Sequence, residues 1–441
     1  MKNRDDYGDV KKGKSVSGSQ ASAGIFAVIA FGLVACVLYG IGAGIRSDIG
    51  ILLNPLADQC GIHYEDVSLC IAVMQFVFGA AQPVFGMIAS RKSNRFVLIL
   101  GTGFLSVSLI GMMLARSFAV LMFSLGILFG CGTGAIAFGL VLTSAIYFVG
   151  QEHAMIISGM LNAAAGMGGF IFSPLLQSLL QAGGTARALS VMIVPVLFLI
   201  PVAYFVTSRD PGKGGTDTSF TEPEKLASGE QSFKAELSSE PDRPRKSELP
   251  FKNAFSNKTY RMLVAGFMTC GFHMIIIESH LFSQYVSYGI AKTAASWAFS
   301  VYGIATILGA LLSGFLSSRF RKGRLLGFYY GFRAVWTLFY IFLLPKNVLT
   351  AVVFAIGLGM TGDATVSPTS GLVNENFSLK DVATLIGLLF LVHQIGAFFS
   401  AWFGGVLLKV TGSYTAIWMI DVVLCIFASS MSLRIREKPN K

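Results

Sequence analysis

Long apolar runs alternate with short polar stretches along most of the chain, a pattern that predicts membrane-spanning helices. A helix needs about 20 apolar residues to cross the hydrocarbon core of a bilayer. Two sets of six runs reach that length. The first set covers 23–45, 67–90, 96–115, 117–150, 154–186 and 188–208. The second set covers 260–290, 293–318, 323–345, 347–375, 382–408 and 410–433.

A polar stretch separates the two sets of runs. Residues 209–258 are rich in Ser, Glu, Lys, Gly and Pro and show no hydrophobic period, so we expect a linker there. We therefore predict an all-α membrane protein with twelve transmembrane helices in two pseudo-symmetric six-helix bundles. The predicted parts are a tail at 1–22, bundles at 23–208 and 259–434, and a tail at 435–441.

Composition supports a membrane protein. Of the 441 residues, 54% are hydrophobic and only 13% are charged, whereas soluble domains carry about 25% charged residues. The net charge of +11 is the difference between 34 basic and 23 acidic residues. Most of the basic residues lie in segments that the twelve-helix topology places on one side. This bias predicts a multi-pass protein of the cell (plasma or inner) membrane, with both termini and the linker cytoplasmic. It disfavours nucleic acid as a partner.

A short motif recurs at the same place in each half. "GMIASRKSNR", which begins at Gly86, follows the second run, and "GFLSSRFRKGR", which begins at Gly314, follows the eighth. Both contain Gly-x-x-x-Ser-Arg, so Arg91 and Arg319 occupy matching positions. Internal repeats of this kind are typical of transporters, and we expect these loops to gate the protein. The alternative is that any short cytoplasmic loop is basic and that glycine recurs by chance.

Two six-helix halves, a central linker and this paired loop resemble the major facilitator superfamily. "GIRSDIGILLNPLADQCGI" in the first half and "HQIGAFFSAWFGGVLLKVTGSY" in the second resemble its bacterial branch of monocarboxylate porters and oxalate/formate exchangers. In the loop, Ser90 stands where the superfamily usually has Asp. The resemblance implies two bundles that rock around a central substrate site.

Arg46 stands in the otherwise apolar first helix. A charge inside the bilayer is costly and needs a reason. One reading is an interfacial anchor whose long side chain reaches the headgroups. The other is a substrate anchor, because a guanidinium binds a carboxylate bidentately. The resemblance favours the second reading, since Arg46 falls within about a residue of the substrate-binding cation of the porters.

Other polar side chains in the apolar runs are candidates for the same site. Glu278 would lie at the depth of Arg46 and either pairs with it, takes up a proton, or sits inertly at a wet mouth. Tyr39 shares a helix face with Arg46 and, with Tyr147, could frame a small polar cavity, although packing against lipid or core is the alternative for each. We expect His273 to face the cavity as a hydrogen-bonding group.

The later helices carry further candidates. His393 either contacts substrate or bridges two helices. We predict that Arg333 forms a structural ion pair with Asp363 or Glu375, and that Asp363 is a second proton-site candidate. With five histidines in all, we expect no metal centre.

The predicted function is secondary active transport of a small organic anion, a monocarboxylate or short dicarboxylate. It would proceed by alternating access, coupled to protons or to exchange of another anion. No phosphate-binding loop for ATP is found, and no catalytic cluster, so we predict no enzyme activity and no cofactor. The expected partners are the substrate and the lipid bilayer, and we expect a monomer. The alternative is an efflux pump for drug-like or neutral solutes.

Overall fold

The computed structural model describes residues 25–150, 153–209, 254–377 and 379–437. The predicted tail at 1–22 lies outside the described residues, as do most of the predicted linker and the last four residues. The described chain is helical and contains no strand. Its first half consists of α1 (Ile25–Ser47), η1 (Ile49–Leu52), α2 (Leu53–Cys60), α3 (Tyr64–Arg91), α4 (Asn94–Leu114), α5 (Phe118–Leu121), η2 (Met122–Phe129), α6 (Gly130–Ala135), α7 (Phe138–Val149) and α8 (Ala154–Val206).

The second half repeats this organisation. It consists of α10 (Lys258–Ile276), η6 (Ile277–Leu281), α11 (Phe282–Ser287), α12 (Lys292–Arg319), α13 (Lys322–Phe342), α14 (Val348–Thr361), η7 (Asp363–Thr365), α15 (Val366–Asn376), α16 (Leu379–Thr411) and α17 (Thr415–Leu433). The segments η2 and η6 are π-helical, so each winds more widely than the α-helices that it joins.

The described residues form 11 continuous helices that are long and apolar enough to cross a membrane. One of them, α8, has 53 residues and would extend about 80 Å if straight, far more than a bilayer core. It reverses at Gly183 and Gly184, where Gly184 has a φ of 69° that favours glycine. Counting its two arms separately gives twelve spanning segments, and the predicted all-helical membrane fold is confirmed.

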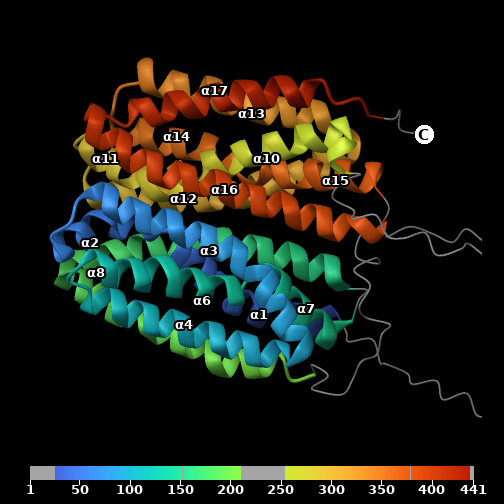
Figure 1. Cartoon of the computed structure of the whole chain (residues 1–441), viewed down its shortest axis with the longest axis horizontal. Coiled ribbons are helices and arrows are strands. Elements are labelled where there is room, and N and C mark those ends of the chain that lie inside the picture. The colour runs from blue at the N-terminus through green and yellow to red at the C-terminus, as the bar shows by residue number, and fades with distance from the viewer. Residues whose placement is uncertain (1–24, 151–152, 210–253, 378, 438–441) are drawn as a thin grey trace, which may run out of the picture.

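The helices gather into two groups, with α1–α8 in one and α10–α17 in the other (Figure 1). Across the boundary, α3 packs against α16 and α8 packs against α12. Gly166 of α8 and Gly303 of α12 allow the second of these pairs to approach closely, because a Cβ at either position would meet the other's carbonyl oxygen. The boundary between the two groups is therefore a tight helix–helix contact at these points.

The two ends of the molecule differ in charge. Arg91 and Arg319 lie in the final turns of α3 and α12, and Arg434 directly follows α17. We call this the basic end; it is on the right in Figure 1, where α17 ends. The opposite end, called the far end below, carries η1, α2, η6 and α11.

Candidate functional site

Arg46 lies at the boundary of the two bundles and is bonded to both. Its Nη1 donates to Oε2 of Glu278 in η6 at 3.1 Å and to Oε1 of Gln75 in α3 at 3.2 Å. The Gln75 amide in turn donates to the same Glu278 oxygen at 3.4 Å. The guanidinium also lies over the Phe78 ring, 4.9 Å from its centroid. The charge is thus held by a carboxylate, an amide and an aromatic face.

Local helix geometry explains why these side chains meet. Gln75 and Phe78 are three residues apart on α3, so they project from one face toward α1. Glu278 lies in the π-helical turn η6, a type of irregularity that is common at functional sites. The Arg46 side chain is 19% exposed and that of Glu278 is 8% exposed. The pair is therefore shielded, and the guanidinium retains more access than its partner.

Three further predicted residues lie near this pair. Asp363 and His393 are close enough to interact electrostatically with Glu278, and Tyr39 interacts in the same way with Arg46. Asp363 lies in η7, where the helix breaks between α14 and α15. The structure therefore brings Arg46, Glu278, Asp363, His393 and Tyr39 into one cluster. A second guanidinium, that of Arg333, interacts electrostatically with Asp363 and His393.

Hydrogen bonds between the bundles hold the far end closed. Tyr64 pairs with Nδ1 of His280 at 2.8 Å, and Asn54 donates to Ser283 at 3.1 Å. Lys409 forms an ion pair with Glu65 at 2.5 Å. Further hydrogen bonds between the bundles, from Ser173 to the Ser296 carbonyl and from Ser300 to the Phe170 carbonyl, lie in the same half of the molecule. The site is thus shut off from the far end by bonds that join one bundle to the other.

A family model described as Major Facilitator Superfamily matches residues 32–287 and 281–441. The chain belongs to the major facilitator superfamily. It is a multi-pass membrane transporter, and the predicted family is confirmed.

Three curated relatives within the superfamily are similar to this chain at low identity. An uncharacterized MFS-type transporter, YcxA of Bacillus subtilis, is 22% identical over 93% of this chain and 94% of its own length. Monocarboxylate transporter 12-B of Danio rerio is 24% identical over 77% of this chain and 72% of its own length. The oxalate:formate antiporter of Oxalobacter formigenes is 24% identical over 44% of this chain and 47% of its own length.

A solved superfamily-like structure agrees in fold. A bacterial homologue of the human lysosomal transporter Spinster, crystallised in an inward-facing and unoccupied conformation, aligns with a TM-score of 0.65 and 16% identity. The alignment covers 94% of this chain and 99% of that one. At this identity the likeness concerns the fold alone.

The superfamily loop motif lies at the basic end in both halves. Arg91 is exposed, and the Arg319 guanidinium lies 4.5 Å from the ring centroid of Phe315 in its own helix. An added Cβ at Gly86 would meet nothing, and one at Gly314 would meet only the Ser367 hydroxyl, 3.9 Å away. The gating role of these loops stays a prediction.

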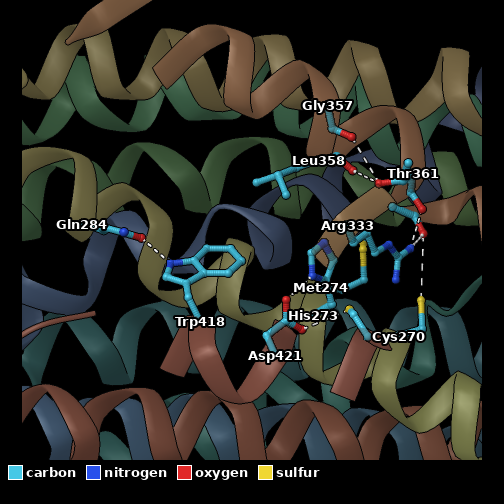
Figure 2. Close-up of polar contacts among 12 residues, drawn as sticks. Cys270, His273, Met274, Gln284, Arg333, Gly357, Leu358, Thr361, Trp418 and Asp421 are labelled. Atoms are coloured by element: carbon cyan, nitrogen blue, oxygen red, sulfur yellow. Dashed lines mark hydrogen bonds and ion pairs between the residues drawn. The ribbon is translucent and has the colours of Figure 1, made fainter. Parts of the chain in front are cut away.

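His273, one predicted substrate contact of this transporter, lies away from the cluster, and Tyr147 does not adjoin Tyr39. His273 is fully buried within the second bundle, where its Nδ1 lies 2.7 Å from Oδ2 of Asp421 (Figure 2). Tyr39 packs edge to face on Phe138 at the start of α7, whereas Tyr147 lies near the end of that helix. The two tyrosines are therefore separated along α7, and the cavity that they would frame stays a prediction.

The predicted ion pair of Arg333 is also corrected. Its Nη2 donates to the carbonyl oxygens of Thr361 and, at 2.7 Å, of Gly362 (Figure 2). Glu375 pairs instead with Lys322, and no ion pair joins Arg333 to Asp363 in the described structure. The reason is local: α14 ends at Thr361, and the carbonyls of a helix end lack intrahelical donors.

Gln75 is the functional candidate that the sequence analysis missed. It is fully buried and bonded to both charges of the central pair. A polar amide in the middle of the apolar stretch "LCIAVMQFVFG" is the signal that could have identified it, since buried amides are retained where they find partners.

Proposed function

We propose that this superfamily member transports small organic anions, monocarboxylates or short dicarboxylates, and that Arg46 binds the carboxylate of the substrate. The observation that carries the proposal is the partner of Arg46, a carboxylate from the opposite bundle. A substrate carboxylate has the same chemistry as Glu278 and can take its place on the guanidinium. The printed names of two relatives, a monocarboxylate transporter and an oxalate:formate antiporter, support the same class of substrate.

The position of the pair suits alternating access. Because Arg46 and Glu278 belong to different bundles, their bond holds the bundles together at the far end. When the substrate displaces Glu278, one of the bonds that join the bundles is lost, and the bundles become freer to rock about the central site. Substrate binding and far-end opening would then be linked by competition for one guanidinium.

The charges of the cluster support coupling to a second ion. Two carboxylates, Glu278 and Asp363, lie near two guanidinium groups, because Arg46 acts on both carboxylates and Arg333 acts on Asp363. An anion that enters this cluster adds a further negative charge, which favours either uptake of a proton by a carboxylate or exit of another anion. We propose proton coupling or anion exchange as the source of energy.

The charge bias sets the proposed orientation. Following the positive-inside rule, the basic end would face the cytoplasm, so that the far end faces outward. The structure would then be closed toward the outside. We propose that the protein works as a monomer in the plasma or inner membrane.

Uptake by the purified protein in proteoliposomes tests this function. Radiolabelled formate, lactate and oxalate are supplied with and without a pH gradient, and each is compared with a neutral solute of similar size. We expect saturable anion uptake that is lost in Arg46→Ala and kept in Arg116→Ala, which removes an exposed arginine on a loop at the far end. Normal anion uptake by Arg46→Ala, or uptake of the neutral solute alone, would show that the proposal is wrong.

A further inference from the structure

A hollow of about 620 Å³ lies at the basic end of the second bundle, within the size range of ligand pockets. It lies among the beginnings of α10 and α13 and the segment that follows α17. Its lining residues are Lys258, Arg321, Arg324, Leu433, Arg434, Ile435, Arg436 and Glu437. A second hollow of about 340 Å³ adjoins it and shares four of these residues. Five of the eight lining residues of the larger hollow are cations.

The single acid of the lining is already engaged. Glu437 accepts hydrogen bonds from the backbone N–H groups of Lys322 at 2.9 Å and Gly323 at 2.7 Å. Its carboxylate therefore caps the start of α13, and its single negative charge offsets one of the five lining cations. Within the described chain, none of the five lining cations has a side-chain acceptor. The hollow is thus positive, with five cationic side chains and one carboxylate in its lining.

The segment that bears two of the arginines is held in place. Ile435 is buried between Arg434 and Arg436, and the Glu437 cap fastens the segment to α13. The two guanidinium groups therefore project from an anchored stretch of backbone, which reduces the entropy lost when they bind an anion.

The hollow also has an apolar side. Leu433, the last residue of α17, lines the hollow and is 58% exposed. Met262 of α10 lines the adjoining hollow. Spanning helices end at the level of the lipid headgroups. The hollow therefore offers cations to a headgroup and exposed apolar side chains to the acyl chains of the same lipid.

We propose that this hollow binds the phosphate headgroup of an anionic phospholipid. Guanidinium groups bind phosphate oxygens bidentately, and basic pockets between transmembrane helices on the cytoplasmic side bind anionic headgroups. The acyl chains would lie along Leu433. Such a lipid would connect α10, α13 and α17 at their basic ends, and the inference does not depend on which substrate is transported.

Lipid binding to the purified full-length protein tests this proposal. The protein in detergent is titrated with four compounds: phosphatidylglycerol, phosphatidylcholine, glycerol phosphate and inorganic phosphate. Binding is followed by native mass spectrometry and by the thermal stability of the protein. We expect phosphatidylglycerol to bind in preference to phosphatidylcholine. In Arg434→Ala/Arg436→Ala the affinity for phosphatidylglycerol should fall about thirtyfold, because each basic residue contributes about 1 kcal/mol near an anionic surface.

Matched variants make the outcome decisive. Arg91→Ala/Lys92→Ala removes two exposed cations from the basic end of the first bundle and should leave the affinity unchanged. Arg434→Lys/Arg436→Lys should restore most of the binding, which separates loss of the site from misfolding. Equal losses in both alanine pairs, or equal binding of the two lipids, would overturn the proposal. Glycerol phosphate or inorganic phosphate could also stabilise the protein as much as phosphatidylglycerol does. That result would assign the hollow to a soluble phosphate compound and overturn the lipid assignment.

Discussion

The guanidinium of Arg46 lies 3.1 Å from the carboxylate of Glu278, 232 positions away along the chain and in the other bundle. Lys409 and Glu65 also pair across the boundary, but the Lys409 side chain is 60% exposed, and such pairs contribute only about 0–1 kcal/mol. The Arg46 pair is shielded, so removing one partner is costly. A carboxylate substrate that replaces Glu278 avoids this cost, since the guanidinium keeps an anionic partner.

Replacing Glu278 by Gln should tighten anion binding. The amide is a weaker partner for Arg46 than the carboxylate and adds no negative charge near the substrate. We expect the Kd of a transported anion to fall about tenfold, the equivalent of about 1.4 kcal/mol. Isothermal titration calorimetry on the purified protein measures this, with Glu375→Gln as the control for loss of a carboxylate at the basic end. Unchanged or weaker binding in Glu278→Gln would contradict competition for Arg46.

Replacing Tyr64 by Phe should loosen the far end. The change removes the hydroxyl that pairs with His280 at 2.8 Å but keeps the ring. We expect the closed state to lose about 1 kcal/mol of stability relative to the open state, which raises the population of the open state about fivefold. The probe is a cysteine at the fully buried Ser279, placed in a background without the six native cysteines and labelled by a thiol reagent. Tyr204→Phe, at an exposed tyrosine, should not change the labelling rate.

A methyl group at Gly50 should prevent the far end from closing. A Cβ there would lie 2.7 Å from the carbonyl oxygen of Ser279 in the other bundle, too close for backbone to accommodate. We expect Gly50→Ala to destabilise the closed state by about 1–3 kcal/mol and to increase labelling at residue 279. Gly42→Ala is the matched control, because a Cβ at that position of α1 meets nothing. Slow labelling in Gly50→Ala would mean that η1 and η6 can separate without opening the site.

Replacing Arg333 by Gln should destabilise the second bundle. Arg333 is fully buried and binds the carbonyl oxygens of Thr361 and Gly362, and the shorter amide cannot reach both. We expect a loss of about 2–4 kcal/mol, measured as a lower thermal midpoint in detergent. Arg319→Gln, an exposed arginine on α12, should have little effect. A larger effect on anion affinity than on stability would show that Arg333 has a role at the central site.

The sequence by itself determined the membrane fold and its repeat. A helix satisfies its own backbone hydrogen bonds in lipid, so an apolar run that is long enough to cross the bilayer predicts a spanning helix without any knowledge of its neighbours. It also identified Arg46 and Glu278 as charges that needed a reason to be inside the membrane. The break between the apolar runs 154–186 and 188–208 also predicts two spanning segments within α8, although only the structure places the reversal at Gly183 and Gly184.

Only the tertiary structure decided which polar groups meet. A charge pair depends on the rotation and depth of two helices that lie far apart in sequence, and local pattern encodes neither. Packing at the boundary turned Gln75 toward Arg46 and Glu278. Packing inside the second bundle places His273 next to Asp421. Arg333 binds the free carbonyl oxygens at the end of α14 and forms no ion pair with the carboxylates that the sequence suggested.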